Sequence, residues 1–333
     1  MASLAPAVSQ PVTRLGKGPN RMDVTLHIGA HRTATSVFQN YLQENEADLA
    51  SRGIGVLGPK RTRSGLLGGV LPRPGDIRTQ AQQLRRARGR IGLTIRNARA
   101  RGLHHLLISD ENMLGTPRQN LRDSRLYRGC GNRLARFDAA FGGRIARVFL
   151  SVRAQDRYWA SIVAFCVARG ARVPDSADLD RLVTSGRHWR DVIRDVAMAL
   201  PKAQIIVLPY ETHGGLPECQ LSLMTGLANP PRAHAREWMN RAPGLPQLRQ
   251  VLRDRGANPA IVPDGEGRWH PFDRMQTMVL REIYADDLFW LRAGADGLAT
   301  LIEETRPEKM GKTPLQALTE RGQHNGIETR RLA

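Results

Sequence analysis

Hydroxyl side chains and an arginine gather in a short segment that separates a strand-like run from a helix-like run. The apolar run 24–28 is of strand type, and apolar residues at helical spacing begin at Val37. Between them stand Gly29, Arg32 and the hydroxyl residues Thr33, Thr35 and Ser36. A turn from strand to helix leaves the first N–H groups of the helix without partners, and such groups bind anions. The segment therefore predicts a site for a phosphate-like group.

Two adjacent carboxyl groups follow another strand-like segment. Residues 103–109 form the apolar run, and Asp110 and Glu111 come directly after it. Ligands of parallel sheets bind at the carboxyl ends of the strands. The two acids are therefore candidates for proton transfer beside the phosphate-like group. The alternative is that Asp110 or Asn112 only caps the following turn and that Glu111 only faces solvent.

The loop at residues 29–36 is not a Walker loop. That motif reads G-x-x-x-x-G-K-[ST], whereas here Arg32 comes too early and no second glycine precedes it. The stretch instead resembles the 5′-phosphosulfate loop of sulfotransferases, which reads H-I-G-x-x-K-T-G-T-T or a close variant. Their donor is 3′-phosphoadenosine 5′-phosphosulfate (PAPS). Arg32 replaces the usual lysine and Ala34 the usual glycine, and we expect alanine to exclude a backbone conformation with positive φ.

A second part of the chain resembles the same family. Arg153 follows the strand-like run 147–152, and Ser161 stands eight positions later on the next predicted helix. In the family, an arginine and a serine in these places hold the 3′-phosphate of PAPS. Arginine offers two hydrogen bonds to phosphate oxygens, and serine adds a hydroxyl donor. ATP has no 3′-phosphate, so this pair would distinguish a PAPS site from an ATP site.

The resemblance covers about residues 23–210 and implies a PAPS-dependent sulfotransferase. The implied fold is α/β, a three-layer, P-loop-like fold with a central parallel sheet flanked by helices. Glu111 is the implied general base, with Asp110 as its rival, and Arg32 neutralises the leaving phosphate without a metal ion. The implied donor-binding residues are Gly29, Ala30, His31, Arg32, Thr33, Ala34, Thr35, Ser36, Arg153 and Ser161.

The C-terminal part of family members covers the adenine and completes the 3′-phosphate site. In this chain the candidates for that role are Arg255-Gly256 and the cluster Arg268-Trp269-His270. The acceptor would be a hydroxyl or an amine, for example on a carbohydrate, another acidic molecule or a small molecule. Acceptor pockets are built from variable loops, so the fold does not identify the acceptor.

Three other functions agree with parts of the sequence. An ATP-dependent P-loop kinase or NTPase would require Mg²⁺ and would be indifferent to Arg153. A basic nucleic-acid-binding protein without catalytic activity would use the arginines of residues 60–101. A protein that kept the donor site and lost the chemistry would account for Ala34.

The chain is strongly basic, with 50 Lys and Arg against 31 Asp and Glu and a formal net charge of +19. Residues 60–101 hold twelve of the bases and one acid, Asp76. Such a block suits an anionic partner, although a solvent-exposed helix face can look the same. We expect an acidic acceptor, such as an anionic glycan, rather than nucleic acid.

The length of 333 residues, 41% of them hydrophobic, suffices for one large domain. We expect a disordered leader at 1–22, a single domain at 23–305 and a polar tail at 306–333, with an Arg-rich lid or helix inserted at about 58–101. No run approaches the length of a membrane span, and three scattered cysteines lack metal-ligand spacing. These features favour a cytoplasmic protein and do not indicate an oligomeric state.

Hydrophobic periodicity predicts most of the remaining elements. Short strands are expected at 54–57 and 204–208. Helices are expected at 77–100, at 178–200 as one long amphipathic helix, and at 273–291. Residues 58–75 have the composition of a loop or lid, and residues 227–271 that of an irregular segment.

Overall fold

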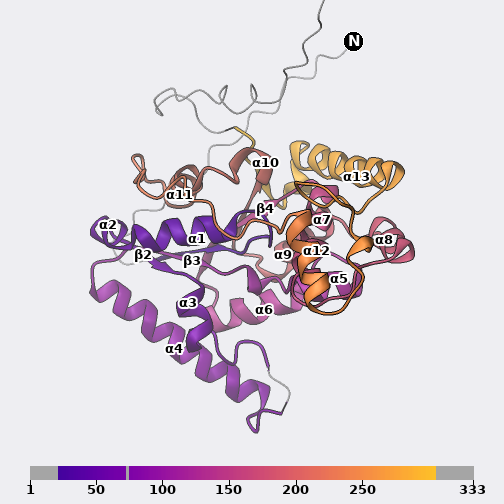
Figure 1. The fold of residues 1–333 in the computed structure, drawn as a ribbon. Coiled ribbons are helices and arrows are strands. Elements are labelled where there is room, and N and C mark those ends of the chain that lie inside the picture. Colours follow the sequence, from indigo (N-terminus) through magenta and orange to yellow (C-terminus); the bar gives the residue numbers. More distant parts are fainter. Residues whose placement is uncertain (1–21, 73–74, 305–333) are drawn as a thin grey trace, which may run out of the picture. The chain divides into compact units, whose positions relative to one another are not determined.

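The computed structural model describes residues 22–72 and 75–304. Its fold is α/β, and a six-stranded parallel sheet with the order β2-β3-β1-β4-β5-β6 forms the centre (Figure 1). The predicted parallel sheet flanked by helices is therefore confirmed. The strands are β1 (Asp23–His27), β2 (Ile54–Leu57), β3 (His105–Ser109), β4 (Ile145–Val152), β5 (Gln204–Pro209) and β6 (Thr300–Leu301).

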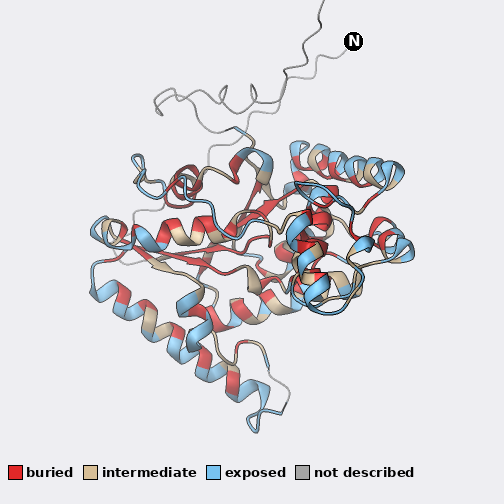
Figure 2. Ribbon diagram, viewed as in Figure 1, coloured by how far each residue is buried: buried red, intermediate tan, exposed pale blue. Residues whose placement is uncertain are grey.

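Alternating strand residues pack against helices on the two faces of the sheet, which makes three layers. Leu106 and Ile108 of β3 belong to one core cluster, whereas Leu107 between them belongs to the other. The larger cluster includes residues of α4 (Gln80–Ala100), α6 (Cys130–Phe141), α7 (Gln155–Val167) and α9 (Trp189–Ala199). The smaller cluster includes residues of α1 (Thr35–Glu44), α2 (Glu46–Ser51) and α11 (Pro217–Thr225). Figure 2 shows the buried residues running through the sheet and along the inner sides of these helices.

The strand order changes direction at β1, and this positions the site. From β1 the chain first builds β2 and β3 on one side and then builds β4, β5 and β6 on the other side. His27, at the end of β1, is paired with Ser109 of β3 and Phe149 of β4. The loops that follow β3, β1 and β4 consequently meet at one edge of the sheet, where open α/β sheets bind their ligands.

The prediction of one long helix over 178–200 is wrong. The structure has α8 (Ser176–Val183) and α9, with a break at residues 184–188. Gly186 takes a positive φ of 65°, which ends helical geometry. The N–H of His188 then donates to Asp191, and this contact starts the second helix.

Two segments that looked irregular contain short helices. Residues 58–75 include α3 (Pro59–Arg61) and a π-helical turn, η1 (Thr62–Leu66), and residues 227–271 include α12 (Leu245–Asp254) and η3 (Pro259–Ile261). The helix expected over 77–100 is confirmed from Gln80, where Thr79 caps it. The remaining helices are η2 (Glu111–Met113), α5 (Pro117–Asp123), α10 (Tyr210–His213), α13 (Arg274–Arg292) and η4 (Ala295–Gly297).

The contacts place the described residues from Met22 to Glu303 in one compact unit. The predicted leader and tail, apart from Met22, lie outside the described residues. No helix in the described ranges is both long and apolar enough to cross a membrane.

Candidate functional site

The loop after β1 packs directly against the loop after β3. Gly29 has a φ of 101°, and a Cβ built on it would lie 2.9 Å from the Cβ of Glu111. A larger residue at this position would therefore push the two loops apart. This close approach places the backbone of the predicted phosphate loop beside one of the two predicted acids.

The first half of the phosphate loop is fastened to its surroundings by its own polar groups. The N–H of Ala30 donates to the carbonyl of Ser151 (2.9 Å), and the N–H of His31 donates to the hydroxyl of Tyr127 (2.9 Å). The buried hydroxyl of Thr33 donates to the carbonyl of Ala30 (2.7 Å). These groups therefore have partners within the protein.

Four of the implied donor-binding residues do not line the cavity that contains Arg32 and Arg153. Gly29, Ala30, His31 and Thr33 do not line it, and their contacts hold the loop in shape. The ring of His31 lies between Tyr127 (2.9 Å from Nδ1) and Asn112 (3.1 Å from Nε2). Burial lowers the pKa of His31, against the opposing effect of the nearby Glu111 carboxylate.

The second half of the loop lines the cavity and leads into α1. Arg32, Ala34, Thr35 and Ser36 all contribute to its wall. No side chain of the described residues caps the N-terminus of α1. The first N–H groups of this helix therefore face the cavity as free donors for an anion.

Ala34 adopts the left-handed backbone conformation, which is unfavourable for alanine. Its φ is 61° and its ψ is 22°. The expectation that alanine would exclude a positive φ here is therefore wrong. The backbone takes this conformation because the loop must turn sharply into α1, and the Cβ of alanine makes it costly.

Replacing Ala34 by glycine should stabilise the protein by about 1 kcal/mol, because glycine adopts this conformation without a steric penalty. Urea unfolding of the variant would measure the change. Ala50→Gly in α2 is the matched control and should lose stability, since glycine in a helix interior is unfavourable. A loss of stability in both variants would contradict this reading of the loop.

Arginines dominate the cavity wall. Arg32, Arg153, Arg241 and Arg268 line it, and none of its described lining residues is acidic. The cavity has a volume of about 60 Å³ and adjoins a second cavity of about 520 Å³. The two share Arg153, Ser161, Ala242 and Arg268, and the second also contains the aromatic residues Trp269, His270 and Phe272. The pair of cavities offers concentrated positive charge next to a roomier, partly aromatic space.

Arg153 is a buried cation without a carboxylate partner among the described residues. It is 5% exposed, and its Nη1 donates to the carbonyl of Arg32 (2.8 Å). Its guanidinium lies 4.4 Å from the ring centroid of Tyr210, while Nε has no hydrogen-bond partner. Burial lowers the pKa of Arg153, because desolvation disfavours the charged form. A buried, incompletely satisfied guanidinium of this kind is prepared to accept an anion.

Ser161 lies beside Arg153 in the cavity wall, and both residues contact Arg32. The Nε of Arg32 donates to the hydroxyl of Ser161 (3.0 Å), and its Nη2 donates to the carbonyl of Asn240 (3.1 Å). Burial and the neighbouring positive charges of Arg153 and Arg169 lower the pKa of Arg32 to about 10. Arg32 therefore forms one cluster with Arg153 and Ser161, which follow it in the sequence by 121 and 129 positions.

The segment Trp238–Ala242 crosses this cluster, and no motif in the sequence indicated that it would. Its five residues line the cavity, and the carbonyl of Asn240 holds Arg32. Of the two C-terminal candidates, Arg268-Trp269-His270 lies at the second cavity. Arg255 instead donates to the carbonyls of Val167 and Ala171 and lines neither cavity.

Glu111 faces a separate groove. This groove meets the cavity lined by the four arginines, called the donor cavity below, at Ser36, Met239 and Asn240. Its carboxylate accepts hydrogen bonds from Gln39 (2.7 Å) and Arg63 (3.0 Å). Burial alone would raise the pKa of Glu111, but the nearby His31, the hydrogen bond from Gln39 and the charge of Arg63 outweigh it and lower the pKa. The carboxylate is therefore ionised at neutral pH and can accept a proton.

Asp110 has a different environment. Its carboxylate accepts hydrogen bonds from the hydroxyl of Thr62 (2.5 Å), from Arg63 (2.7 Å) and from the N–H of Asn112 (3.1 Å). It is 3% exposed and does not line the groove. Asp110 therefore holds the π-helical turn η1 against β3, and the geometry favours Glu111 of the two predicted acids.

Gln39 is a positioning residue that the sequence analysis missed. It lies one turn after Thr35 on α1, so helical spacing would have placed it beside the phosphate loop. Its side-chain nitrogen contacts both Ser109 (3.3 Å) and Glu111 (2.7 Å). This arrangement connects the start of α1 to the carboxylate.

If Glu111 is a general base, Gln39→Leu should lower kcat by about three- to tenfold, since one hydrogen bond to the carboxylate is lost. The pKa of Glu111 should rise in the variant, because the lost bond stabilised the ionised form. The acidic limb of the pH–kcat profile should therefore move to higher pH. Gln43→Leu, one turn further along α1, should leave the profile unchanged. An unshifted profile in Gln39→Leu would rule out this role.

The comparisons with known proteins assign no family. No protein-family model matches the chain, and no curated protein matches it. Within the described ranges, no group of three or more His, Cys, Asp and Glu side chains is placed to hold a metal ion.

Proposed function

We propose that the chain is a PAPS-dependent sulfotransferase. The observation that carries the proposal is the cluster of Arg32, Arg153 and Ser161 beside the uncapped N-terminus of α1. The cluster lies in a cavity lined by four arginines and, among the described residues, by no acid. It offers two anion-binding positions, one at α1 and one at Arg153, next to a cavity with aromatic walls. A nucleotide with a 5′-phosphosulfate and a 3′-phosphate matches this arrangement of charge.

The reaction transfers a sulfuryl group in line. The bond between sulfur and the 5′-phosphate oxygen breaks, and a bond between sulfur and the acceptor oxygen or nitrogen forms. Glu111 accepts the proton of the acceptor group, and adenosine 3′,5′-bisphosphate leaves. Arg32 and the N–H groups of Thr35 and Ser36 stabilise the negative charge that develops on the departing phosphate.

The positions of the groups support this division of roles. The donor cavity and the groove with Glu111 share Ser36, so a sulfuryl group near Ser36 would lie between donor and acceptor. Guanidinium groups and helix N–H groups supply the positive charge that a metal ion supplies in kinases. We therefore expect turnover to continue in excess EDTA.

We also propose a cytoplasmic location, which the cysteine side chains support. The three cysteines, Cys130, Cys166 and Cys219, are buried, and none of them forms a disulfide within the described residues. This state fits a reducing compartment, and the proposal places the enzyme in the cytoplasm.

Calorimetric titration with adenosine 3′,5′-bisphosphate, beside ATP with Mg²⁺, tests the donor proposal. Tight binding of the bisphosphate in EDTA, and weaker binding of Mg-ATP, is the expected result. Preference for Mg-ATP would replace the proposal with an ATP-dependent kinase or NTPase. Titration with adenosine 5′-phosphate would then measure how much of the affinity the 3′-phosphate contributes.

A further inference from the structure

A groove of about 910 Å³ runs along the edge strand β2 and ends at Glu111. Residues of α1 line one side, and residues of α3, η1 and the C-terminal end of α4 line the other. All four residues of β2 contribute to its floor. A molecule in this groove would therefore extend from the base along the whole edge of the sheet.

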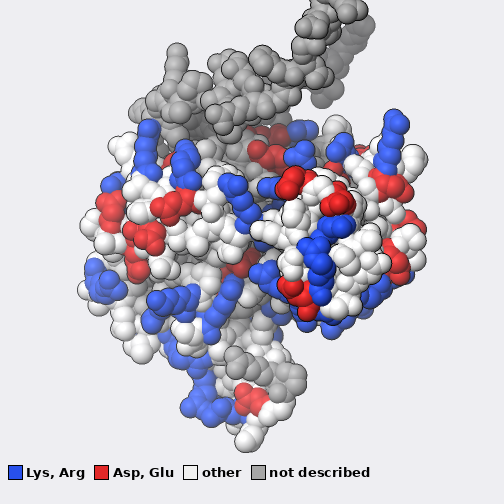
Figure 3. All heavy atoms as spheres, viewed as in Figure 1, with Lys and Arg blue, Asp and Glu red and all other residues white. Residues whose placement is uncertain are grey.

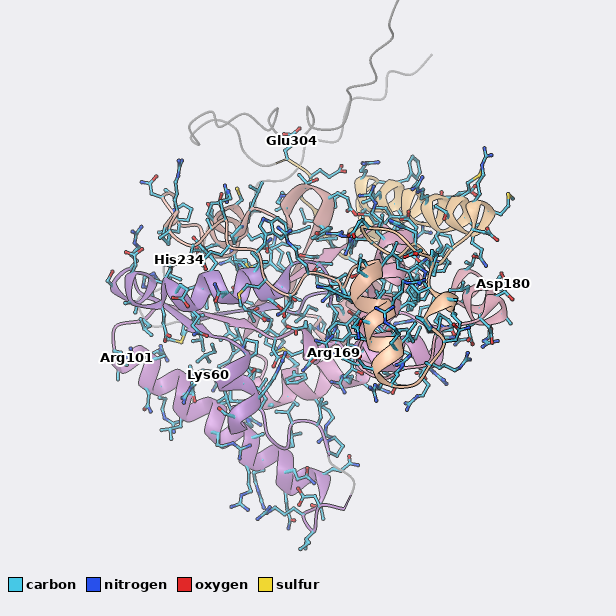
Figure 4. The ribbon with its side chains drawn as sticks, in the orientation of Figure 1. Lys60, Arg101, Arg169, Asp180, His234 and Glu304 are labelled. Atoms are coloured by element: carbon cyan, nitrogen blue, oxygen red, sulfur yellow. The ribbon has the colours of Figure 1, made fainter. Side chains whose placement is uncertain are left out.

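One side of the groove is cationic. Lys60, Arg61, Arg63 and Arg101 line it, against the acids Glu46 and Glu111. Arg63 is paired with Asp110 and Glu111, whereas Lys60, Arg61 and Arg101 have no ion pair within the described ranges. Figure 3 shows lysines and arginines gathered over the lower part of this face, and Figure 4 shows Lys60 and Arg101 there. Unlike Arg63, these three cations form no ion pair with Glu111, so they would bind charges on other parts of a ligand than the reacting group.

The opposite side of the groove is polar and uncharged. Ser36, Gln39, Asn40 and Gln43 line it from successive positions on one face of α1. Amide side chains both donate and accept hydrogen bonds. The nitrogens of Gln39 and Asn40 already donate to Glu111 and Glu237, so these two amides offer their oxygens to the hydroxyl groups of a ligand. On the other side of the groove, Asn97 of α4 adds another amide and Thr94 adds a hydroxyl group. The groove thus suits a molecule that has many hydroxyl groups as well as negative charges.

The cationic surface continues beyond the groove along α4. Arg86, Arg90, Asn97 and Arg101 fall on one face of this helix, because their spacing is a multiple of the helical repeat. From Arg86 to Arg101 the helix extends about 22 Å. α4 contains no acidic residue. A ligand with several charges could therefore bind the groove and this helix face together.

We propose that the acceptor is an anionic polysaccharide, a chain of sugars carrying carboxylate or sulfate groups. This inference rests on the proposed sulfotransferase function. The reacting hydroxyl lies at Glu111, the neighbouring sugars contact the amides of α1, and the charged groups contact Lys60, Arg61 and Arg101. The chain leaves the groove over Arg90 and Arg86.

Two other polyanions fit less well. Single-stranded nucleic acid is bound by stacking on aromatic side chains, and the described residues that line the groove include no Phe, Tyr or Trp. An acidic peptide could pair with the edge strand β2, but it has few hydroxyl groups to match the amides of α1. Both polyanions are therefore included in the test as competitors.

The test measures binding of a polyuronate, its carboxyl-reduced neutral derivative, a polyglutamate of equal charge and a single-stranded oligodeoxynucleotide. The double variant Arg61→Gln/Arg101→Gln removes two groove cations. Arg88→Gln/Arg99→Gln removes the same charge from other faces of α4 and is the matched control. The polyuronate should bind tightest, and the groove variant should weaken it about tenfold, as expected for two exposed charge contacts. The control should change its affinity by less than about twofold.

Separate results would overturn the acceptor and the donor proposals. Equal binding of the neutral polysaccharide, tighter binding of the peptide or the oligonucleotide, or equal losses in both variants would overturn the acceptor proposal. Binding of adenosine 3′,5′-bisphosphate is measured on the same proteins and should be unchanged in both variants. Failure of the wild type to bind this bisphosphate would instead overturn the sulfotransferase function. Transfer of labelled sulfate from PAPS to the polyuronate is the final positive result.

Discussion

Glu111→Gln should lower kcat for sulfuryl transfer by about 10²- to 10⁴-fold, the usual contribution of a general base. Glutamine keeps the shape of the side chain and can still contact Gln39 and Arg63, but it cannot accept the acceptor's proton. Binding of adenosine 3′,5′-bisphosphate should be unchanged, because Glu111 lines the groove and not the donor cavity. Single-turnover transfer and calorimetry would measure the two effects separately.

Glu46→Gln is the control for this experiment. Glu46 also lines the groove, so its replacement removes the same charge from the same space. The control should retain kcat within about threefold, since Glu46 has no role in proton transfer. If Glu111→Gln also retained its kcat, another group would have to be the base.

Arg153→Met should weaken the binding of adenosine 3′,5′-bisphosphate by about a hundredfold or more, since a buried charge-assisted contact is lost. Methionine fills much of the volume of arginine without its charge. Affinity for adenosine 5′-phosphate, which lacks the 3′-phosphate, should change by less than about threefold. Calorimetry with the two nucleotides would therefore show whether Arg153 recognises the 3′-phosphate.

The unfolding free energy shows whether Arg153→Met still folds normally. Arg153 is buried without a carboxylate partner among the described residues, so its removal leaves no unpaired charge behind. Arg169→Met, which removes an arginine outside the cavity wall, is the matched control for binding. Equal weakening of both nucleotides by Arg153→Met, in a protein of normal stability, would argue against a 3′-phosphate contact.

The sequence predicted those parts of the site that depend on local pattern. Arg153 and Ser161 could be placed because one ends a buried strand and the other lies on the following helix. Both residues contact Arg32, and the hydrogen bond between Arg32 and Ser161 joins positions 129 residues apart in the sequence. The sheet could be predicted for the same reason, since its central strands are continuous apolar runs.

The rest of the site depends on contacts that no local pattern contains. Arg63 reaches Asp110 and Glu111 from a π-helical turn, and the segment Trp238–Ala242 reaches the donor cavity without regular structure. The left-handed Ala34 could not be predicted either, because alanine is the wrong residue type for that conformation. These features became visible only when the loops after β1, β3 and β4 were in place.

The four arginines that line the donor cavity form no ion pair with any described residue, and they also affect how the protein behaves before any substrate is added. An anion that binds only the folded state raises the apparent melting temperature by mass action, and a ligand at 100 times its Kd adds roughly 2.7 kcal/mol. Phosphate or sulfate in a purification buffer would act in this way on Arg32 and Arg153. The same ions would compete with the nucleotide and make its affinity look weaker than it is. A chloride buffer is therefore the correct reference state for this protein, since carboxylate buffers such as acetate would also bind the arginines.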